Sequence, residues 1–183
     1  MVNLTESIPM AYVKVKNTYG VIDKNGKALE KLSDKLSYNI PELTEITVSK
    51  FTPSEKISVK EEEKFKKTLE ILRDLYNNNF IDKVESVSVS DDMIKLSISD
   101  KLTVELGSFD QLNAKIVMVK EIVATLDEND FGIIDASNAD RVYYDRVMPD
   151  GSIPEEEQTS NTENPSLNPP SLPPLPDEKE LYE

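Results

Sequence analysis

The chain has 183 residues and a formal net charge of −14, and it contains neither cysteine nor histidine. The missing cysteines exclude disulfides, thiolate nucleophiles and zinc–thiolate sites, and the missing histidines remove the commonest general base and transition-metal ligand. Nucleic acids and anionic membrane surfaces bind clustered Lys and Arg, so the acidic balance disfavours both as main partners.

No run of apolar residues reaches the roughly 18 that a membrane-spanning helix needs. The beginning of the chain also lacks the basic and apolar regions of a signal peptide. The chain as it stands is therefore expected to be soluble. The alternative is a fragment whose anchor lies upstream.

The first predicted elements are two strands, at residues 10–16 and 19–23, joined by a short turn at Asn17-Thr18. Asn25-Gly26 is a strong turn signal because both residues tolerate left-handed backbone angles. A third, short β-like run covers residues 45–49.

A helix is predicted next. Ser58 and Glu61 have the spacing of a capping box, in which each side chain bonds the backbone N–H of the other. Four apolar side chains then recur on one face of the helix: Phe65, Leu69, Leu72 and Tyr76. The helix is expected to end in the asparagine run at residues 77–79.

The next segment alternates apolar and polar residues in three short runs, with turns expected at Asp91-Asp92 and Asp100-Lys101. The apolar positions are Val87 and Val89, then Ile94, Leu96 and Ile98, then Leu102, Val104 and Leu106. Alternation with period two predicts an antiparallel meander that buries one face.

A second helix is predicted to cover that meander. Ser108 and Gln111 again have capping-box spacing. A continuous helical stripe follows, formed by Phe109, Leu112, Ile116, Val119, Val123 and Leu126.

Two last strands are predicted at residues 131–136 and 141–147, separated by residues 137–140. Tyr143 and Tyr144 must point to opposite faces of the final strand, which leaves open which of them is exposed. The whole pattern predicts an α+β domain over residues 1–148, a mostly antiparallel sheet with two amphipathic helices packed on it.

Residues 149–183 differ sharply from this domain. They hold eight of the 11 prolines and nine acidic residues against one basic residue. Such a segment buries too little apolar surface to offset chain entropy, so it is expected to be a disordered acidic proline-rich tail. Its run at residues 165–176 favours polyproline II, as a solvated spacer or as a ligand for an aromatic groove.

The clustered carboxylates, Asp91-Asp92 and Asp127-Glu128 with Asp130, lie where turns are expected and are interpreted as solvated. The segment from Asp127 to Gly132 partly echoes a calcium loop. That loop needs an oxygen ligand at its fifth position and a glutamate at its twelfth, where this chain has Phe131 and Asn138. No catalytic residues, metal site or cofactor are therefore predicted.

The order of the motifs resembles a known family. PMAYV at residues 9–13 is followed by YGVIDKNG at 19–26, a helix, a meander ending in LTVELG at 102–107, a second helix, IID at 133–135 and a last strand. This order and spacing resemble the extracytoplasmic β domain of the FtsQ/DivIB family of bacterial cell-division proteins, over about residues 4–147.

The resemblance implies a non-catalytic divisome scaffold that acts in septum formation. Family members have one transmembrane helix, then a POTRA domain, then the β domain. The resemblance therefore implies a truncated chain whose natural start lies upstream, and a domain on the extracytoplasmic face of the cell membrane, held by an anchor missing from this chain.

The implied partners are FtsB- or DivIC-like and FtsL-like division proteins, with no role for nucleic acid. In the family the partner adds a strand beside the last strand of the β domain. The matching partner-binding positions here are Ala139, Asp140, Arg141, Val142, Tyr143 and Tyr144. Two alternatives remain open: a different envelope scaffold with the same domain, and a carboxylate-based enzyme or metal-binding protein.

Overall fold

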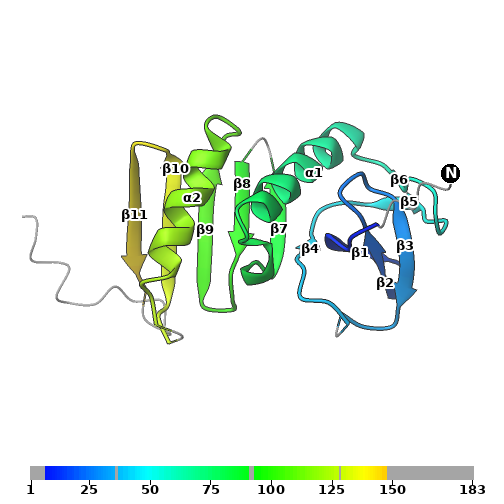
Figure 1. Ribbon diagram of the computed structural model, residues 1–183, viewed down its shortest axis with the longest axis horizontal. Helices are drawn as coiled ribbons and strands as arrows, with labels where there is room; N and C mark the ends of the chain where they lie inside the picture. Colours follow the sequence, from blue (N-terminus) through cyan, green and yellow to red (C-terminus); the bar gives the residue numbers. More distant parts are fainter. Residues whose placement is uncertain (1–6, 36, 91–92, 128, 148–183) are drawn as a thin grey trace, which may run out of the picture.

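The computed structural model describes residues 7–35, 37–90, 93–127 and 129–147. The predicted tail at 149–183 and the predicted turn at Asp91-Asp92 lie outside these residues. The described part forms one mixed sheet of nine strands with both helices against it, together with a separate two-stranded sheet (Figure 1).

The chain begins with a three-stranded antiparallel meander: β1 (Ala11–Val15), β2 (Thr18–Ile22) and β3 (Ala28–Leu32). The turn between β2 and β3 forms because the Asp23 carboxylate accepts hydrogen bonds from the backbone N–H groups of Asn25 and Lys27, at 2.8 and 2.9 Å. Gly26 has a φ of +76°, which side chains disfavour. The first two predicted strands and this turn are confirmed, whereas β3 was not predicted.

Three very short strands follow. They are β4 (Glu42–Leu43), β5 (Val48–Lys50) and β6 (Ser58–Val59). The predicted β-like run at 45–49 is therefore only partly right, because Glu45 has a φ of +60° and β5 begins at Val48. β4 connects two parts of the sheet, since it pairs in parallel with β1 on one side and with β7 on the other.

Helix α1 (Glu62–Asn77) leads into the short 3-10 helix η1 (Ile81–Lys83). The predicted capping box is wrong. Ser58 belongs to β6, and the Glu61 carboxylate instead accepts hydrogen bonds from the backbone and hydroxyl of Thr47, at 2.9 and 3.0 Å. Of the predicted stripe, three members are buried, but Tyr76 is 43% exposed because Leu75 takes the core position in the last turn.

The predicted three-stranded meander is confirmed as β7 (Ser86–Ser90), β8 (Met93–Ser97) and β9 (Leu102–Gly107), paired antiparallel. Its alternating apolar residues face the core, with Ile98 just beyond β8 and only half-buried.

Helix α2 (Leu112–Val123) packs on β9 and β10, and its predicted stripe is confirmed at Leu112, Ile116 and Val119. The predicted capping box is again wrong. Gln111 adopts a left-handed backbone and makes no capping hydrogen bond. Buried Lys115 fixes the start of the helix instead, since its ammonium donates to the carbonyls of Leu106 and Ser108, both at 3.0 Å.

The last two strands are β10 (Gly132–Asn138) and β11 (Arg141–Arg146). The strand order across the sheet is β11-β10-β9-β8-β7-β4-β1-β2-β3. Three neighbouring pairs are parallel, β1 with β4, β4 with β7 and β9 with β10, and the rest are antiparallel. The predicted α+β class with a mostly antiparallel sheet is confirmed.

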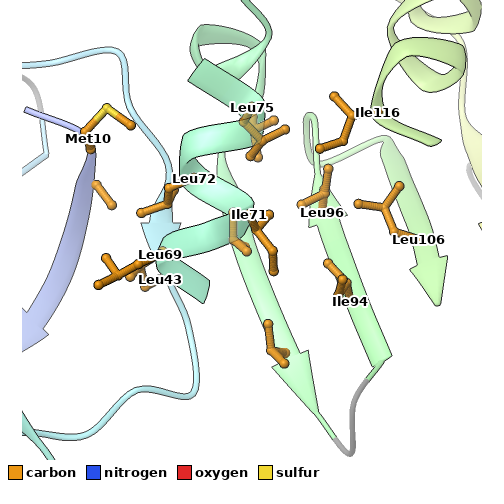
Figure 2. Close-up of a cluster of buried hydrophobic side chains, with 14 of the residues drawn as sticks. Met10, Leu43, Leu69, Ile71, Leu72, Leu75, Ile94, Leu96, Leu106 and Ile116 are labelled. Atoms are coloured by element: carbon orange, nitrogen blue, oxygen red, sulfur yellow. The ribbon is translucent and has the colours of Figure 1, made fainter. Parts of the chain in front are cut away.

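The core lies between the two helices and one face of the sheet. Figure 2 shows Leu69 and Leu72 of α1 near Met10 and Leu43, and Leu75 on the side of the helix that faces Ile116 of α2. Each of these side chains is less than 4% exposed. Helix α1 therefore packs across the narrow region where β4 joins the two parts of the sheet.

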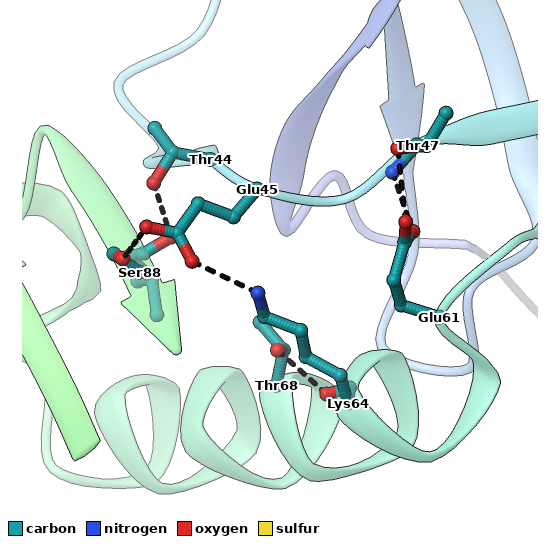
Figure 3. A network of polar contacts seen from close by, with 8 residues as sticks. Thr44, Glu45, Thr47, Glu61, Lys64, Thr68 and Ser88 are labelled. Carbon is teal, nitrogen blue, oxygen red and sulfur yellow. Dashed lines mark hydrogen bonds and ion pairs between the residues drawn. The ribbon is translucent and has the colours of Figure 1, made fainter. Parts of the chain in front are cut away.

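A polar network reinforces the same region (Figure 3). The Glu45 carboxylate accepts hydrogen bonds from the Lys64 ammonium at 2.8 Å and from the Ser88 hydroxyl at 3.1 Å. These contacts tie the β4–β5 connection to α1 and to β7. The Lys64 contact, helped by Ser88, holds the pKa of Glu45 below its usual value. Neither helix in the described part is long and apolar enough to cross a membrane.

Candidate functional site

Strand β11 forms one end of the nine-stranded sheet. It pairs antiparallel with β10 on one side. In the described part of the chain no strand pairs with its other side. An edge of this kind offers backbone N–H and C=O groups to another strand.

The pairing with β10 determines which backbone groups point outward. The Val147 N–H donates to the Phe131 carbonyl at 2.9 Å, so Val147 belongs to the set of residues bonded to the inner neighbour. Bonded residues alternate along an antiparallel strand, which places Asp145 and Tyr143 in that same set. Val142 and Arg146 therefore direct their backbone groups away from β10.

The two adjacent tyrosines occupy different environments. Tyr143 lies opposite Asp135 on the face of the sheet without helices, and it is 53% exposed. Tyr144 packs against the hydrophobic core on the helix side, and its hydroxyl donates to the Phe131 carbonyl at 3.1 Å. The structure thus identifies Tyr143 as the outward tyrosine, a choice that the sequence left open.

The six predicted partner-binding residues do not all lie on the edge. Arg141, Val142, Tyr143 and Tyr144 are in β11. Ala139 and Asp140 form the tight turn before it, where the Asn138 side chain accepts a hydrogen bond from the Asp140 N–H at 2.9 Å. Asp145 and Arg146 also lie on β11, and sequence reasoning missed them although the predicted strand, 141–147, included both.

Glycine allows β10 and β11 to approach closely. A Cβ atom at Gly132 would overlap the Asp145 carbonyl oxygen and come within 2.6 Å of the Tyr144 ring. Any side chain at this position would push β11 outward or displace the Tyr144 ring. The shape of the edge therefore depends on this one residue.

Charged groups surround the exposed tyrosine. The Arg141 guanidinium lies 3.4 Å from the Tyr143 hydroxyl. Hydrogen bonds from the hydroxyl and backbone N–H of Ser137 hold the pKa of Asp135 below its usual value, so Asp135 is anionic at neutral pH. The edge is thus a mixture of apolar surface and both signs of charge, suited to a protein partner.

The other end of the sheet, at β3, is built differently. The Ala28 N–H donates to the Glu55 carbonyl, and the Ser54 N–H donates to the Ala28 carbonyl, both at 2.8 Å. Farther along, Phe51 packs against Gly20, and the Lys31 ammonium lies 5.4 Å from the centre of its ring. The chain itself therefore covers part of the β3 edge.

The described part of the chain also has a concave surface away from the β11 edge. A cavity of about 570 Å³ between the 35–40 segment and η1 is lined by Tyr12, Lys35, Tyr38 and Asp82, among others. Asp130 pairs with Arg146 at 3.1 Å and accepts a hydrogen bond from the Asp127 N–H, as a turn residue does. Among the described residues, no three carboxylates gather into a metal-binding group.

Comparison with known proteins gives one family. The family model described as "Cell division protein FtsQ/DivIB, C-terminal" matches residues 11–137, so its match ends before β11. None of the curated proteins matches the chain. Among solved structures, the major extracytoplasmic domain of the trans isomer of the cell-division protein DivIB from Geobacillus stearothermophilus is 17% identical. The alignment covers 68% of this chain and 98% of that one, with a TM-score of 0.39.

Proposed function

The chain belongs to the FtsQ/DivIB family of cell-division proteins, and from that premise we propose that it is a non-catalytic divisome scaffold that binds its partners by adding a strand beside β11. The observation that carries the proposal is the outer side of β11, which no described strand covers. Backbone bonds formed there would supply affinity, and side chains would select the partner.

The proposed partners are the extracytoplasmic segments of FtsB- or DivIC-like and FtsL-like proteins, which the family resemblance implies. Tyr143 is the main candidate for recognition because it combines a large exposed apolar ring with few rotatable bonds. Arg141, next to it, would pair with a partner carboxylate. The proposed location is the extracytoplasmic face of the cell membrane, as for the family.

The sharpest test of strand addition changes the backbone and keeps the fold. Proline removes a backbone N–H and is tolerated on edge strands where that N–H faces outward. Val142 is such a position, whereas the Tyr143 N–H faces β10. We expect Val142→Pro to retain the folded domain and to lose most of the binding to the partner segment, measured by calorimetric titration.

Two side-chain variants complete this test. Tyr143→Ala should weaken binding by about 1–3 kcal/mol with little change in stability, because the ring is exposed. Tyr144→Ala serves as the matched control and should mainly destabilise the domain, because that ring packs on the core. Unchanged affinity in folded Val142→Pro and Tyr143→Ala would reject strand addition at this edge.

A further inference from the structure

The residues of β11 and the one before it carry a charge pattern that is complementary to itself. In chain order they are Asp140, Arg141, Val142, Tyr143, Tyr144, Asp145 and Arg146. When this segment is laid antiparallel to a copy of itself with Tyr143 at the centre, every acidic residue meets a basic one. The two valine–tyrosine pairs then lie between the central tyrosines and the charged pairs.

The backbone permits the same alignment. Val142 directs its N–H and C=O away from β10, and hydrogen-bonded pairs in an antiparallel ladder require outward-facing residues on both strands. With Tyr143 at the centre, Val142 lies opposite Tyr144 of the second copy, and both of these residues direct their backbone groups away from β10. Shifting one strand by a single residue would break this match.

The two charges nearest the centre are available for such pairing. The Asp145 carboxylate has no hydrogen-bond or ion-pair partner among the described residues, and the Arg141 guanidinium contacts only the Tyr143 hydroxyl there. Both side chains lie on the face without helices, with Tyr143 between them. Arg146 already pairs with Asp130, so the outer Asp140–Arg146 pairs add less.

From this arrangement we infer that a second copy of the chain pairs antiparallel with β11, about a two-fold axis through Tyr143. Arg141 of each copy pairs with Asp145 of the other, and the two Tyr143 rings meet at a position where side chains of facing strands approach most closely. On the helix side, Val142 packs against Tyr144 of the second copy. The two sheets then form one continuous sheet with no open edge between them.

The contact is small, so the dimer is expected to be weak. One pair of edge strands covers less surface than the roughly 1,200–2,000 Å² typical of stable interfaces. This inference does not rest on the proposed function. If both hold, self-pairing and partner binding exclude each other because they use the same backbone groups, and self-pairing protects the edge until a partner displaces it.

Charge exchange on the full chain tests the inference directly. Sedimentation velocity over a range of concentrations should show reversible dimerisation of the natural chain. Arg141→Asp and Asp145→Arg should each weaken the dimer by about tenfold or more, because each replaces two attractive cross-strand pairs with two repulsive ones. The double variant restores both pairs and should dimerise as the natural chain does.

Mixing the two single variants gives a stricter result. Arg141→Asp is acidic at both positions 141 and 145 and Asp145→Arg is basic at both, so the mixture should form a heterodimer that neither variant forms alone. Lys31→Asp, on the exposed surface of β3, is the control for Arg141→Asp with the same change of charge and should dimerise normally. Circular dichroism verifies that every variant is folded.

Several outcomes would overturn the inference. The natural chain could stay monomeric at about millimolar concentration. The single variants could dimerise as strongly as the natural chain, or their mixture could form no heterodimer. Titrating each variant with a DivIC- or FtsB-like segment separates the two proposals. Partner binding by a strictly monomeric chain rejects only self-pairing, and a dimer that binds no partner rejects only the proposed function.

Discussion

The two edge strands of the sheet, β3 and β11, differ in how far the described chain covers their outer backbone groups. At β3, backbone groups of residues 54 and 55 bond to Ala28. At β11, the described residues supply no such cover. Proteins usually protect sheet edges because an uncovered edge invites association. Within the described residues, the chain covers part of the β3 edge with its own backbone and leaves β11 uncovered, and this difference is why we propose β11 as the place for association.

The largest expected effect concerns the helix that supports the open edge. Ile116 of α2 is fully buried against the strands next to β11. Ile116→Ala removes buried methyl groups and leaves a cavity, so it should lower the free energy of unfolding by about 2–5 kcal/mol in a urea titration. A loss below about 0.5 kcal/mol would show that α2 does not pack on this half of the sheet.

Gly132→Ala should act on the open edge alone. The new methyl group would overlap the Asp145 carbonyl and crowd the Tyr144 ring, at an expected cost of about 1–3 kcal/mol. Amide hydrogen exchange should become faster in β11 while the amide of Ala28, bonded to Glu55, keeps its protection. Equally faster amide exchange at both edges would mean that the two edges are not structurally independent.

A smaller effect is expected between the edges, at Glu45. Glu45→Gln weakens its contacts with Lys64 and Ser88, and exposed pairs of this kind contribute about 0.2–1 kcal/mol. Because the folded state lowers the pKa of Glu45, its contribution is present above the ordinary value near 4.5 and is lost as the pH falls through the lowered pKa. Denaturant titrations at a series of pH values should therefore show a stability difference between natural and variant chains that is largest at pH 7 and shrinks as the pH falls below the ordinary value. A difference that stays constant with falling pH would exclude this ionic origin.

The smallest effect is expected from the tail. Removing residues 154–183 should change the melting temperature by less than about 2 °C, because exposed tails add little to global stability. A drop of about 5 °C or more would show that the tail packs on the domain. An accompanying loss of exchange protection in β11 would place that contact on the edge.

Sequence reasoning succeeded where a periodic pattern was long enough to determine which face is buried. The alternation through Val87, Leu96 and Val104 is strict, and all three side chains are buried as predicted. It failed for β4 and β6, because strands of two residues carry no periodicity. Their positions depend on partners distant in the chain, such as Ser86 and Val87 beside β4.

The capping boxes failed for a similar reason. The spacing of Ser58 and Glu61 is correct, but Thr47, which lies just before β5, donates both hydrogen bonds to the Glu61 carboxylate in place of Ser58. The exposed tyrosine of β11 was also beyond the sequence, because a shift of one residue exchanges Tyr143 and Tyr144. Only the pairing with β10 fixes the register, and the sequence contains no local signal for it.

The two-residue strand β4 has a mechanical consequence for the sheet. Tension applied across the sheet, from β3 to β11, must pass through two short parallel ladders, at Glu42 and Leu43. These two ladders are the shortest connection in the sheet. Helix α1 packs across them, with Leu69 on one side and Leu75 on the other (Figure 2). Under load the sheet would divide there first, while the strands that carry the β11 edge stay together.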